Sequence, residues 1–273
     1  MGAIGGEDDT GLSHDLIIVG AGLAGSMVAK YAQDKGLKPI VLDDGNDWAA
    51  SRASSNLSTP SWIKSLGELG EQGLENLRKY WPVDIIPFNE GKMPAYYLAM
   101  DNVLWRNPYS AFVIEVGDGW VKTDQEKFEG VVVVAAGVWS EDLLSIEGMQ
   151  SIAGHTFIFK GIWNEPLLKL WAPYRHLKVF QWLPNLIMFG DSTAVLNKNY
   201  SDRTQLTSLQ RARALGLIGS HTVLHGLRPV VKGKKVVCEQ RGEKLWLLTG
   251  GGKMGMTVYA SAAKDLVERI CNA

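Results

Sequence analysis

The sequence predicts an α/β fold in which a parallel sheet covered by helices is joined to a smaller antiparallel sheet. Three observations lead to this prediction. An apolar run of strand length enters a glycine-rich turn at residues 15–25, and a helical pattern starts inside that turn. A second uninterrupted apolar run, residues 131–137, is typical of a buried parallel strand. Between residues 156 and 196 the pattern changes to short strands separated by turn residues, as in an antiparallel sheet.

The glycine-rich turn has the strand–turn–helix context of a Rossmann-type dinucleotide-binding domain. Gly20, Gly22 and Gly25 have the spacing G-x-G-x-x-G. In that motif the first glycine permits a tight turn, the second lets the backbone approach a pyrophosphate, and the third lets helix and strand pack closely. The next apolar run ends in Asp43, where an acid would meet the ribose hydroxyls. The alternative is a tight turn that binds no ligand.

The composition is that of a globular protein with a packed core. Of the 273 residues, 46% are hydrophobic and 21% are charged, and the formal net charge is -1. This balance argues against avid, sequence-independent binding to nucleic acid, which needs a basic surface. The two cysteines, Cys238 and Cys271, provide neither a disulfide framework nor a metal-ligand cluster. Residues 1–14 lack a signal-peptide core and no apolar run is long enough to span a membrane, so we expect a cytoplasmic protein.

Periodicity predicts the elements in the middle of the chain. Residues 49–60 are small and hydroxyl-bearing, which indicates a loop that either approaches a flat ligand or only links two elements. Apolar residues at helical spacing predict a helix over 66–80, which Pro82 would stop. A strand is expected over 93–100, and residues 111–123 are typical of a β-hairpin.

The last part of the chain mixes strands with two helices. We expect strands over 156–160, 177–182 and 186–190, a helix over 204–217, a loop over 226–229, strands over 235–238 and 245–248, a glycine-rich loop over 249–257 and a helix over 256–271. The antiparallel strands should lie over the dinucleotide site as a substrate layer.

In this order, the motifs resemble those of the D-amino-acid oxidase family of FAD-dependent oxidoreductases, which includes glycine, sarcosine and D-amino-acid oxidases. The resemblance is carried by the glycine fingerprint with Asp43, the small-residue segment 53–55, the A-A-G-x-W-S strand tip 135–140, the G-L-R-P segment 226–229 and the glycine-rich loop 249–257. This chain is an unusually short member by that resemblance. In its last loop, Gly251 and Met254 replace a histidine and an aromatic residue that are common in the family.

The resemblance implies a discontinuous Rossmann-type FAD-binding domain and a smaller antiparallel β-sheet substrate domain. Residues 1–60, 126–150 and 226–273 would form the first, and residues 61–125 and 151–225 the second. The cofactor-binding residues would be Gly20, Gly22, Leu23, Ala24, Gly25, Asp43, Asp44, Ala53, Ser54, Ser55, Ala135, Ala136, Gly137, Trp139, Arg228, Gly250, Gly251, Gly252, Lys253, Met254, Gly255, Met256 and Thr257. We expect FAD to be bound non-covalently, because Cys238 lies inside a β-branched run typical of a core strand.

The implied reaction is oxidation of the C–N bond of an amino-acid-like amine. A hydride passes to flavin N5, the resulting imine hydrolyses, and O2 reoxidises the flavin. Arg228 is the candidate anchor for the substrate carboxylate, because its planar guanidinium can bind a carboxylate bidentately; a surface or FAD-stabilising arginine is the alternative. Lys253 could stabilise negative charge on the reduced flavin or could be a solvated lysine. Tyr97 could line the pocket, although core packing is the plainer role.

Two other functions stay open at this stage. In the first, the same chemistry acts on a glycine-like amino acid carried on a modified nucleobase of tRNA or DNA, and the short substrate domain leaves room for it. In the second, the chain is a flavin-binding subunit that needs a partner chain to complete its pocket. The sequence does not distinguish a free from a tethered amino acid, nor O2 from another electron acceptor. We expect neither a metal nor a membrane among the partners.

Overall fold

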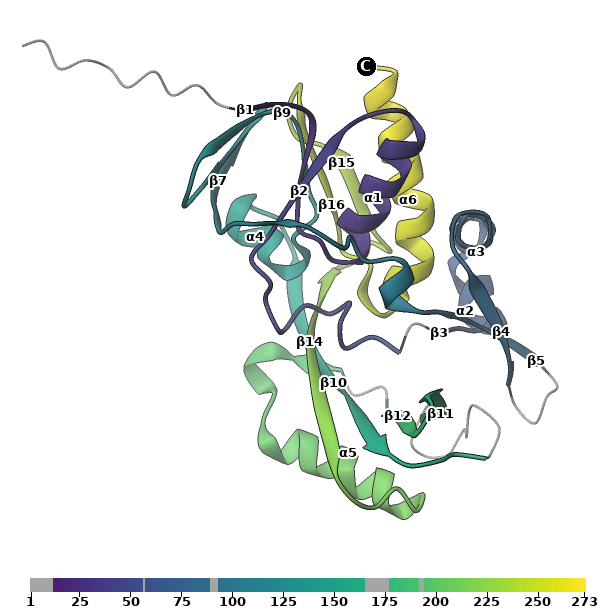
Figure 1. Cartoon of the computed structure of the whole chain (residues 1–273). Helices are drawn as coiled ribbons and strands as arrows, with labels where there is room; N and C mark the ends of the chain where they lie inside the picture. Colours follow the sequence, from purple (N-terminus) through teal and green to yellow (C-terminus); the bar gives the residue numbers. More distant parts are fainter. Residues whose placement is uncertain (1–11, 56, 89–92, 165–176, 192–193) are drawn as a thin grey trace, which may run out of the picture.

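The computed structural model describes residues 12–55, 57–88, 93–164, 177–191 and 194–273. In Figure 1 a large sheet with helices beside it forms the upper part of the molecule, and a smaller antiparallel sheet forms the lower part. The long strands β10 (Met149–Lys160) and β14 (His221–Val231) connect the two parts (Figure 1).

The large sheet contains the predicted parallel core. Its strand order is β15-β16-β9-β1-β2-β6. The strands in this order are β15 (Val237–Gln240), β16 (Leu245–Thr249), β9 (Lys127–Val134), β1 (Leu12–Val19), β2 (Pro39–Asp43) and β6 (Tyr109–Ser110), and a hairpin described below adds two more strands to the sheet. Five of these strands run parallel to one another: β16, β9, β1, β2 and β6. Strand β15, at the edge, is antiparallel to β16. The predicted strands of the fingerprint are therefore confirmed.

The second half of the central strand β1, residues 16–19, is entirely apolar because both of its faces are covered. Leu16 and Ile18 belong to one buried cluster, and Ile17 and Val19 belong to another. Successive side chains of a strand point to opposite faces, so each cluster fills one side of the sheet. A parallel sheet buried on both sides needs this continuous apolar run instead of an alternating one.

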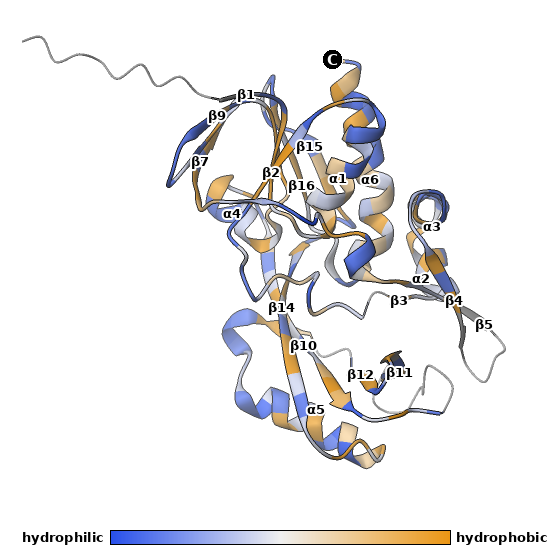
Figure 2. Ribbon diagram, in the orientation of Figure 1, coloured by the Kyte–Doolittle hydropathy of each residue, from blue (hydrophilic) through white to orange (hydrophobic). Residues whose placement is uncertain are grey.

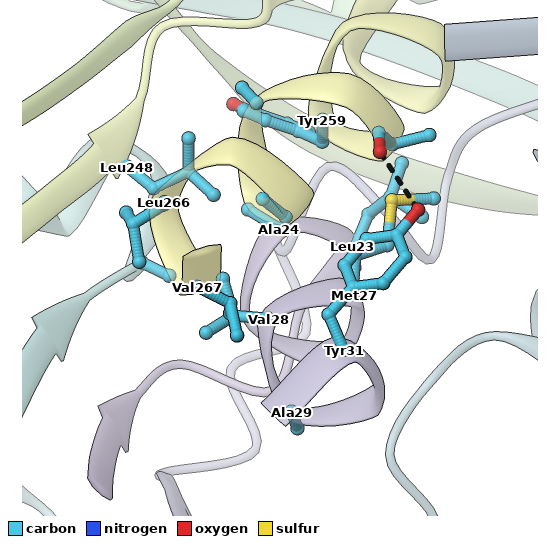
Figure 3. Packing of buried hydrophobic residues seen from close by; sticks show 14 of the residues in the cluster. Leu23, Ala24, Met27, Val28, Ala29, Tyr31, Leu248, Tyr259, Leu266 and Val267 are labelled. Atoms are coloured by element: carbon cyan, nitrogen blue, oxygen red, sulfur yellow. Dashed lines mark hydrogen bonds between the residues drawn. The ribbon is translucent and has the colours of Figure 1, made fainter. Parts of the chain in front are cut away.

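Two helices that are far apart in sequence cover one face of the large sheet. Helix α1 (Leu23–Asp34) and helix α6 (Gly255–Cys271) lie side by side, and their apolar faces meet (Figure 3). Met27 is fully buried in this cluster. The hydroxyl of Tyr31 donates a hydrogen bond of 2.8 Å to the Ala260 carbonyl. Figure 2 shows hydrophobic colour along the central strands, whereas the outer helix α5 (Asp202–Ala214) is largely hydrophilic.

A hairpin and a short helix cover the opposite face. The hairpin consists of β7 (Val113–Gly117) and β8 (Trp120–Thr123), and β8 pairs antiparallel with β9. Val121 is fully buried in the cluster on this face, and Leu143 of the short helix α4 (Ser140–Leu143) packs against that cluster. The structure confirms the hairpin that the sequence predicts over 111–123.

Next to α6 lie two further helices and a three-stranded sheet. These are α2 (Pro60–Leu66), α3 (Glu68–Tyr80), β3 (Leu57–Ser58), β5 (Met93–Leu98) and β4 (Val83–Phe88), with sheet order β3-β5-β4. The predicted helix over 66–80 is confirmed as α3, but it begins at Glu68 because Gly67 has a φ of 65° and interrupts the helical backbone. Residues 57–60 belong to the predicted loop, but residues 57 and 58 form β3 and residue 60 begins α2.

The smaller sheet confirms the predicted antiparallel strands. Strands β11 (Lys178–Leu183), β12 (Leu186–Gly190), β13 (Val195–Leu196) and β14 join around β10, all in antiparallel pairs. Helix α5 (Asp202–Ala214) contributes Ala212 to a core on this sheet that also contains Phe157 and Val179. Residues 165–176 of the predicted substrate layer lie outside the described part of the chain.

The predicted loop over 226–229 is wrong, because these residues lie in the middle of strand β14. Gly226 pairs with Gly154 of β10, and Arg228 pairs with Ile152. Glycine and proline usually signal a turn, but Pro229 can occupy this position because β10 is the one strand that pairs with β14 among the described residues, apart from single bridges at Leu227 and Val230. Glycine is needed at position 226, because an added Cβ would lie only 3.0 Å from the Cα of Ala50.

Strand pairing divides the chain differently from the predicted domain boundaries. Strands β6, β7 and β8 pair with the large sheet, although they fall in the segment 61–125 that was assigned to the substrate domain. Strand β14 pairs with the smaller sheet, although residues 226–231 were assigned to the FAD-binding domain. The two-domain division itself stays a prediction. Within the described ranges, no helix is both long and apolar enough to cross a membrane, and no group of His, Cys, Asp and Glu side chains is placed to hold a metal ion.

Candidate active site

The glycine turn between β1 and α1 brings backbone into contact where side chains would not fit. Gly20 has a φ of 104°, and a Cβ added to it would lie 2.6 Å from the Ala135 carbonyl oxygen at the end of β9. A Cβ at Gly25 would lie 1.9 Å from the Gly20 carbonyl oxygen. Gly22 differs, because its added Cβ would meet only the Ser51 hydroxyl at 3.3 Å, and Gly22 lines a cavity. The turn is thus packed on one side and open on the other.

Asp43 ties the glycine turn to the end of β2. The Ala21 N–H donates a hydrogen bond of 2.6 Å to one oxygen of its carboxylate, and the Gly45 N–H donates one of 2.8 Å to the other. The Leu23 N–H, at the start of α1, donates to the Ser51 hydroxyl at 2.8 Å. Carboxylate oxygens have lone pairs beyond those used here, so Asp43 can still accept a hydrogen bond from a ribose hydroxyl.

A cavity of about 360 Å³ runs along this turn. Most of the residues that the sequence predicts to bind the cofactor line it. They are Gly20, Gly22, Leu23, Ala24, Asp43, Asp44, Ala53, Ser54, Ser55, Ala135, Ala136, Gly137, Trp139, Arg228, Gly252, Lys253, Met254, Gly255 and Met256. They come from six separate stretches of the chain, four of which follow the carboxyl ends of the parallel strands β1, β2, β9 and β16. In open α/β sheets this is where ligands bind.

Four predicted cofactor residues lie behind the cavity wall. Gly25 packs against the Gly20 carbonyl oxygen inside the turn. The Gly251 N–H donates to the Tyr259 hydroxyl at 2.8 Å, and the neighbouring Gly250 has a φ of 81°. The Thr257 hydroxyl hydrogen-bonds that of Ser58 at 2.6 Å. These residues shape the last loop without lining the cavity.

Tyr97 does not line the cavity either. It lies on β5 with its ring edge-on to Phe180, at a centroid distance of 5.8 Å. Tyr97 is partly buried and packs with Leu57 and Ala95 in a small apolar cluster. Its position does not support the catalytic role considered for it, and the packing role explains it.

Arg228 lines the cavity from edge strand β14 and is partly buried. Burial lowers the pKa of its guanidinium, and the negative charge of Asp191 opposes that change. Asp191 is itself buried and held by two donors, the Ser208 hydroxyl and the Arg211 guanidinium, each at 2.6 Å. The negative charge of Asp191 therefore acts on two arginines, Arg228 and Arg211.

A functional candidate that sequence reasoning missed is Lys178, on β11. Its Nζ donates a hydrogen bond of 3.1 Å to the Ser55 hydroxyl and lies 4.4 Å from the centroid of the Trp62 ring. Burial, with the charges of Arg228 and Lys253, lowers its pKa to about 7. The signal was readable: alternation places Lys178 on the same face of its strand as the buried Phe180, where a lysine is unusual.

Lys253 reaches the same cavity from the short helical turn Gly252–Met254 and is exposed at its edge. Three cationic side chains from three separate elements thus line one cavity. The lining also contains three carboxylates, Asp43, Asp44 and Asp142.

An aromatic group supports the strand that carries Arg228. The Trp48 ring stacks on the His225 ring at a centroid distance of 4.8 Å. His155, on the paired strand β10, is 4% exposed and its Nδ1 lies 2.9 Å from the Tyr200 hydroxyl. Burial lowers the pKa of both histidines, so the group favours neutral imidazoles.

No protein-family model matches the chain. Among curated proteins, a KsdD-like steroid dehydrogenase of Mycobacterium tuberculosis is 48% identical over 44 residues, which are 16% of this chain and 8% of that protein. The chain thus matches only a small part of the length of that relative.

Solved structures are similar over nearly the whole chain. Glycine oxidase from Geobacillus kaustophilus has a TM-score of 0.62 at 14% identity and covers 94% of this chain and 95% of its own. L-amino acid deaminase from Proteus vulgaris has a TM-score of 0.65 at 14% identity, covering 99% and 96%. An FAD-dependent oxidoreductase from Pseudomonas aeruginosa has a TM-score of 0.57 at 13% identity, covering 96% and 90%. The chain has the fold of these proteins, as the motif resemblance predicts.

Proposed function

We propose that this chain is an FAD-dependent oxidoreductase that oxidises the C–N bond of an amino-acid-like amine. One observation carries the proposal: a single cavity extends from the glycine turn to a group of three cations, Lys178, Arg228 and Lys253. A dinucleotide cradle that is continuous with an anion-binding region suits an enzyme that places an acidic substrate against a bound redox cofactor. The fold shared with glycine oxidase and L-amino acid deaminase supports an amino acid as the substrate class.

The residues at the glycine turn fit an FAD pyrophosphate. Gly22 presents bare backbone to the cavity, and the start of α1 directs N–H groups and the positive end of the helix dipole toward the same space. Asp43 stands at the end of β2, where a ribose hydroxyl would bind. The small residues Ala53 and Ser54 leave room for a flat ring further along.

Cys238 supports non-covalent attachment. It does not line the cavity, and its thiol contacts the Ala262 carbonyl oxygen at 3.6 Å beneath α6. Burial raises the pKa of this thiol to about 11, which disfavours the reactive thiolate.

In the proposed reaction, bound FAD supplies the hydride acceptor. Arg228 would hold the substrate carboxylate through its planar guanidinium and so orient the Cα–H bond. Lys253 would stabilise negative charge that develops in the cavity during hydride transfer. Water would then hydrolyse the imine product, and we propose O2 as the final electron acceptor.

The test is direct. The purified protein should be yellow, and denaturation should release intact FAD into solution. Anaerobic mixing with a panel of glycine, sarcosine, proline and D- and L-amino acids should bleach the flavin absorbance with at least one of them. A protein that is isolated without flavin and fails to take up added FAD would contradict the proposal.

A further inference from the structure

Three cations line the cavity, whereas an ordinary amino acid carries a single carboxylate. Lys178 comes from β11, Arg228 from β14 and Lys253 from the turn before α6. All three line the same cavity, and the charges of Arg228 and Lys253 both act on Lys178. Burial lowers the pKa of Lys178 most, these two cations lower it further, and no carboxylate among the described residues raises it.

Two acids of this region already accept hydrogen bonds from groups other than Lys178. Asp191, the acid that acts on Arg228, accepts hydrogen bonds from Arg211 and Ser208. Asp43 accepts two backbone N–H groups at the glycine turn. In the proposed reaction, Arg228 would pair with one substrate carboxylate. Lys253 would pair with the negative charge on the reduced cofactor. Lys178 would then still face the cavity without an acidic partner.

The surroundings of Lys178 hold its ammonium in one place. Ser55 accepts its hydrogen bond at 3.1 Å, and Trp62 lies beneath it at 4.4 Å. A cation over an indole ring is stabilised, and the ring shields that side from water. An ammonium has three donors, of which the Ser55 contact uses one, so others are available to a ligand.

We propose that Lys178 forms a subsite for a second acidic group of the substrate, so that this enzyme acts on an amino acid or amine with two carboxylates. The inference rests on the proposed function and names its substrate class. A carboxylate at Lys178 would form a charge-assisted hydrogen bond and would place a negative charge among three positive ones. The second carboxylate would then distinguish dicarboxylates from monocarboxylates, and the distance between the two carboxylates would select among dicarboxylates.

The first experiment measures binding without catalysis. Succinate and butanoate have the same number of carbons and differ by one carboxylate, and neither has an amine to oxidise. In calorimetric titrations at pH 6.5, succinate should bind the FAD-loaded protein about ten- to a hundred-fold more tightly than butanoate. Lys178→Met should abolish this preference while leaving butanoate affinity unchanged, and Lys178→Arg should retain most of it.

Lys64→Met is the matched control, because Lys64 is exposed on the same helix as Trp62 and should leave the preference unchanged. Succinate that binds the parent no more tightly than butanoate would overturn the subsite. So would a preference that survives in Lys178→Met, or a loss of both affinities in equal proportion. The Arg variant separates loss of charge from loss of folding, since it keeps the charge.

The second experiment uses two secondary amines. Iminodiacetate is sarcosine with a second carboxylate on its N-methyl carbon. Both amines contain the same N–CH2–COO⁻ group, whose C–N bond can be oxidised. At low substrate concentration, iminodiacetate should bleach the flavin faster than sarcosine in the absence of O2. Lys178→Met should slow bleaching by iminodiacetate to the rate with sarcosine and should leave the sarcosine rate unchanged. If the protein takes up no FAD, the proposed function fails, while the succinate titration on the flavin-free chain still decides the subsite. If FAD binds but no amine bleaches it, the oxidation fails and the titration again stands by itself.

Discussion

The Ala21 N–H donates a hydrogen bond of 2.6 Å to the carboxylate of Asp43, so the acid at the end of β2 directly holds the glycine turn after β1. The two residues are 22 positions apart in sequence. The same carboxylate also accepts the Gly45 N–H, which orients it on the turn. Asp43 therefore has a structural task beside the ribose contact proposed for it.

This double task predicts that Asp43→Ala weakens FAD binding. The change leaves two N–H donors without their acceptor and frees the turn that would face the pyrophosphate. We expect the affinity for FAD to fall by about ten- to a hundred-fold. Fluorescence titration of the flavin-free protein with FAD measures it. Asp47→Ala is the control, since 97% of that side chain is exposed, and it should bind FAD like the parent.

Gly22→Val should prevent FAD uptake while the chain still folds. Its Cβ would project into the cavity beside the Ser51 hydroxyl at 3.3 Å, and the two γ-methyl groups would occupy space meant for the pyrophosphate. Gly22→Ala should show a weaker defect in the same direction. Flavin content after purification and circular dichroism of each variant provide the measurement. A yellow Gly22→Val protein with full FAD content would contradict the site.

Arg228→Ala should impair substrate binding more than FAD binding. Loss of a guanidinium that pairs with a carboxylate costs about 2–5 kcal/mol, so flavin bleaching at low substrate should slow by roughly two to three orders of magnitude. Arg228→Lys should rescue only part of this, because an ammonium lacks the planar fork. Stopped-flow bleaching against substrate concentration distinguishes the variants.

The control for this variant is Arg213→Ala, which removes an exposed arginine from α5. Its rates should equal those of the parent. A loss of FAD from Arg228→Ala would instead assign Arg228 to the cofactor. Unchanged bleaching by that variant would mean that another group anchors the carboxylate.

Binding of a dicarboxylate should depend on pH through Lys178. Its pKa is lowered from 10.5 to about 7, first by burial and then by Arg228 and Lys253. The free protein therefore loses this charge as the pH rises through 7, whereas a bound second carboxylate needs it. Succinate affinity should be greatest below pH 7 and should fall above it by at most about tenfold per pH unit.

Titrations between pH 6 and 9 test this expectation, with butanoate as the reference ligand. Lys178→Arg should bind succinate with a flatter pH profile, because arginine keeps its charge throughout this range. An identical slope in the parent and in Lys178→Arg would assign the pH dependence to another group.

Gly73→Ala should destabilise the protein without touching the cavity. A Cβ at this position of α3 would lie 2.1 Å from the Thr257 carbonyl oxygen of α6. Separating the two helices should cost about 1–3 kcal/mol, as overpacked sites do, which lowers the melting temperature by several degrees. Thermal unfolding measures it. Glu75→Ala, at an exposed position of the same helix, should be nearly neutral. Equal melting temperatures for the two variants would show that α3 can shift without cost.

Local patterns predicted the elements that form the dinucleotide cradle. The G-x-G-x-x-G turn, the apolar strands and the acid at position 43 are close in sequence or strongly periodic, so their local conformation follows from their composition. The same local rules failed at Pro229, because its place in a strand depends on the pairing of β14 with β10, which is distant in sequence. They also missed α2, a short helix that is buried at Ile63 and Leu66 against other parts of the fold.

By itself, the sequence determined the class of fold and most of the residues along the cofactor cavity, because those features depend on short-range periodicity and on glycine at special positions. Only the tertiary structure decided which side chains meet at the substrate end. It removed Tyr97 from the cavity by packing it on Phe180, and it brought Lys178 to Ser55, 123 residues away. The physical reason is that charge and hydrogen-bond partners act through space, across strands whose pairing no local pattern encodes.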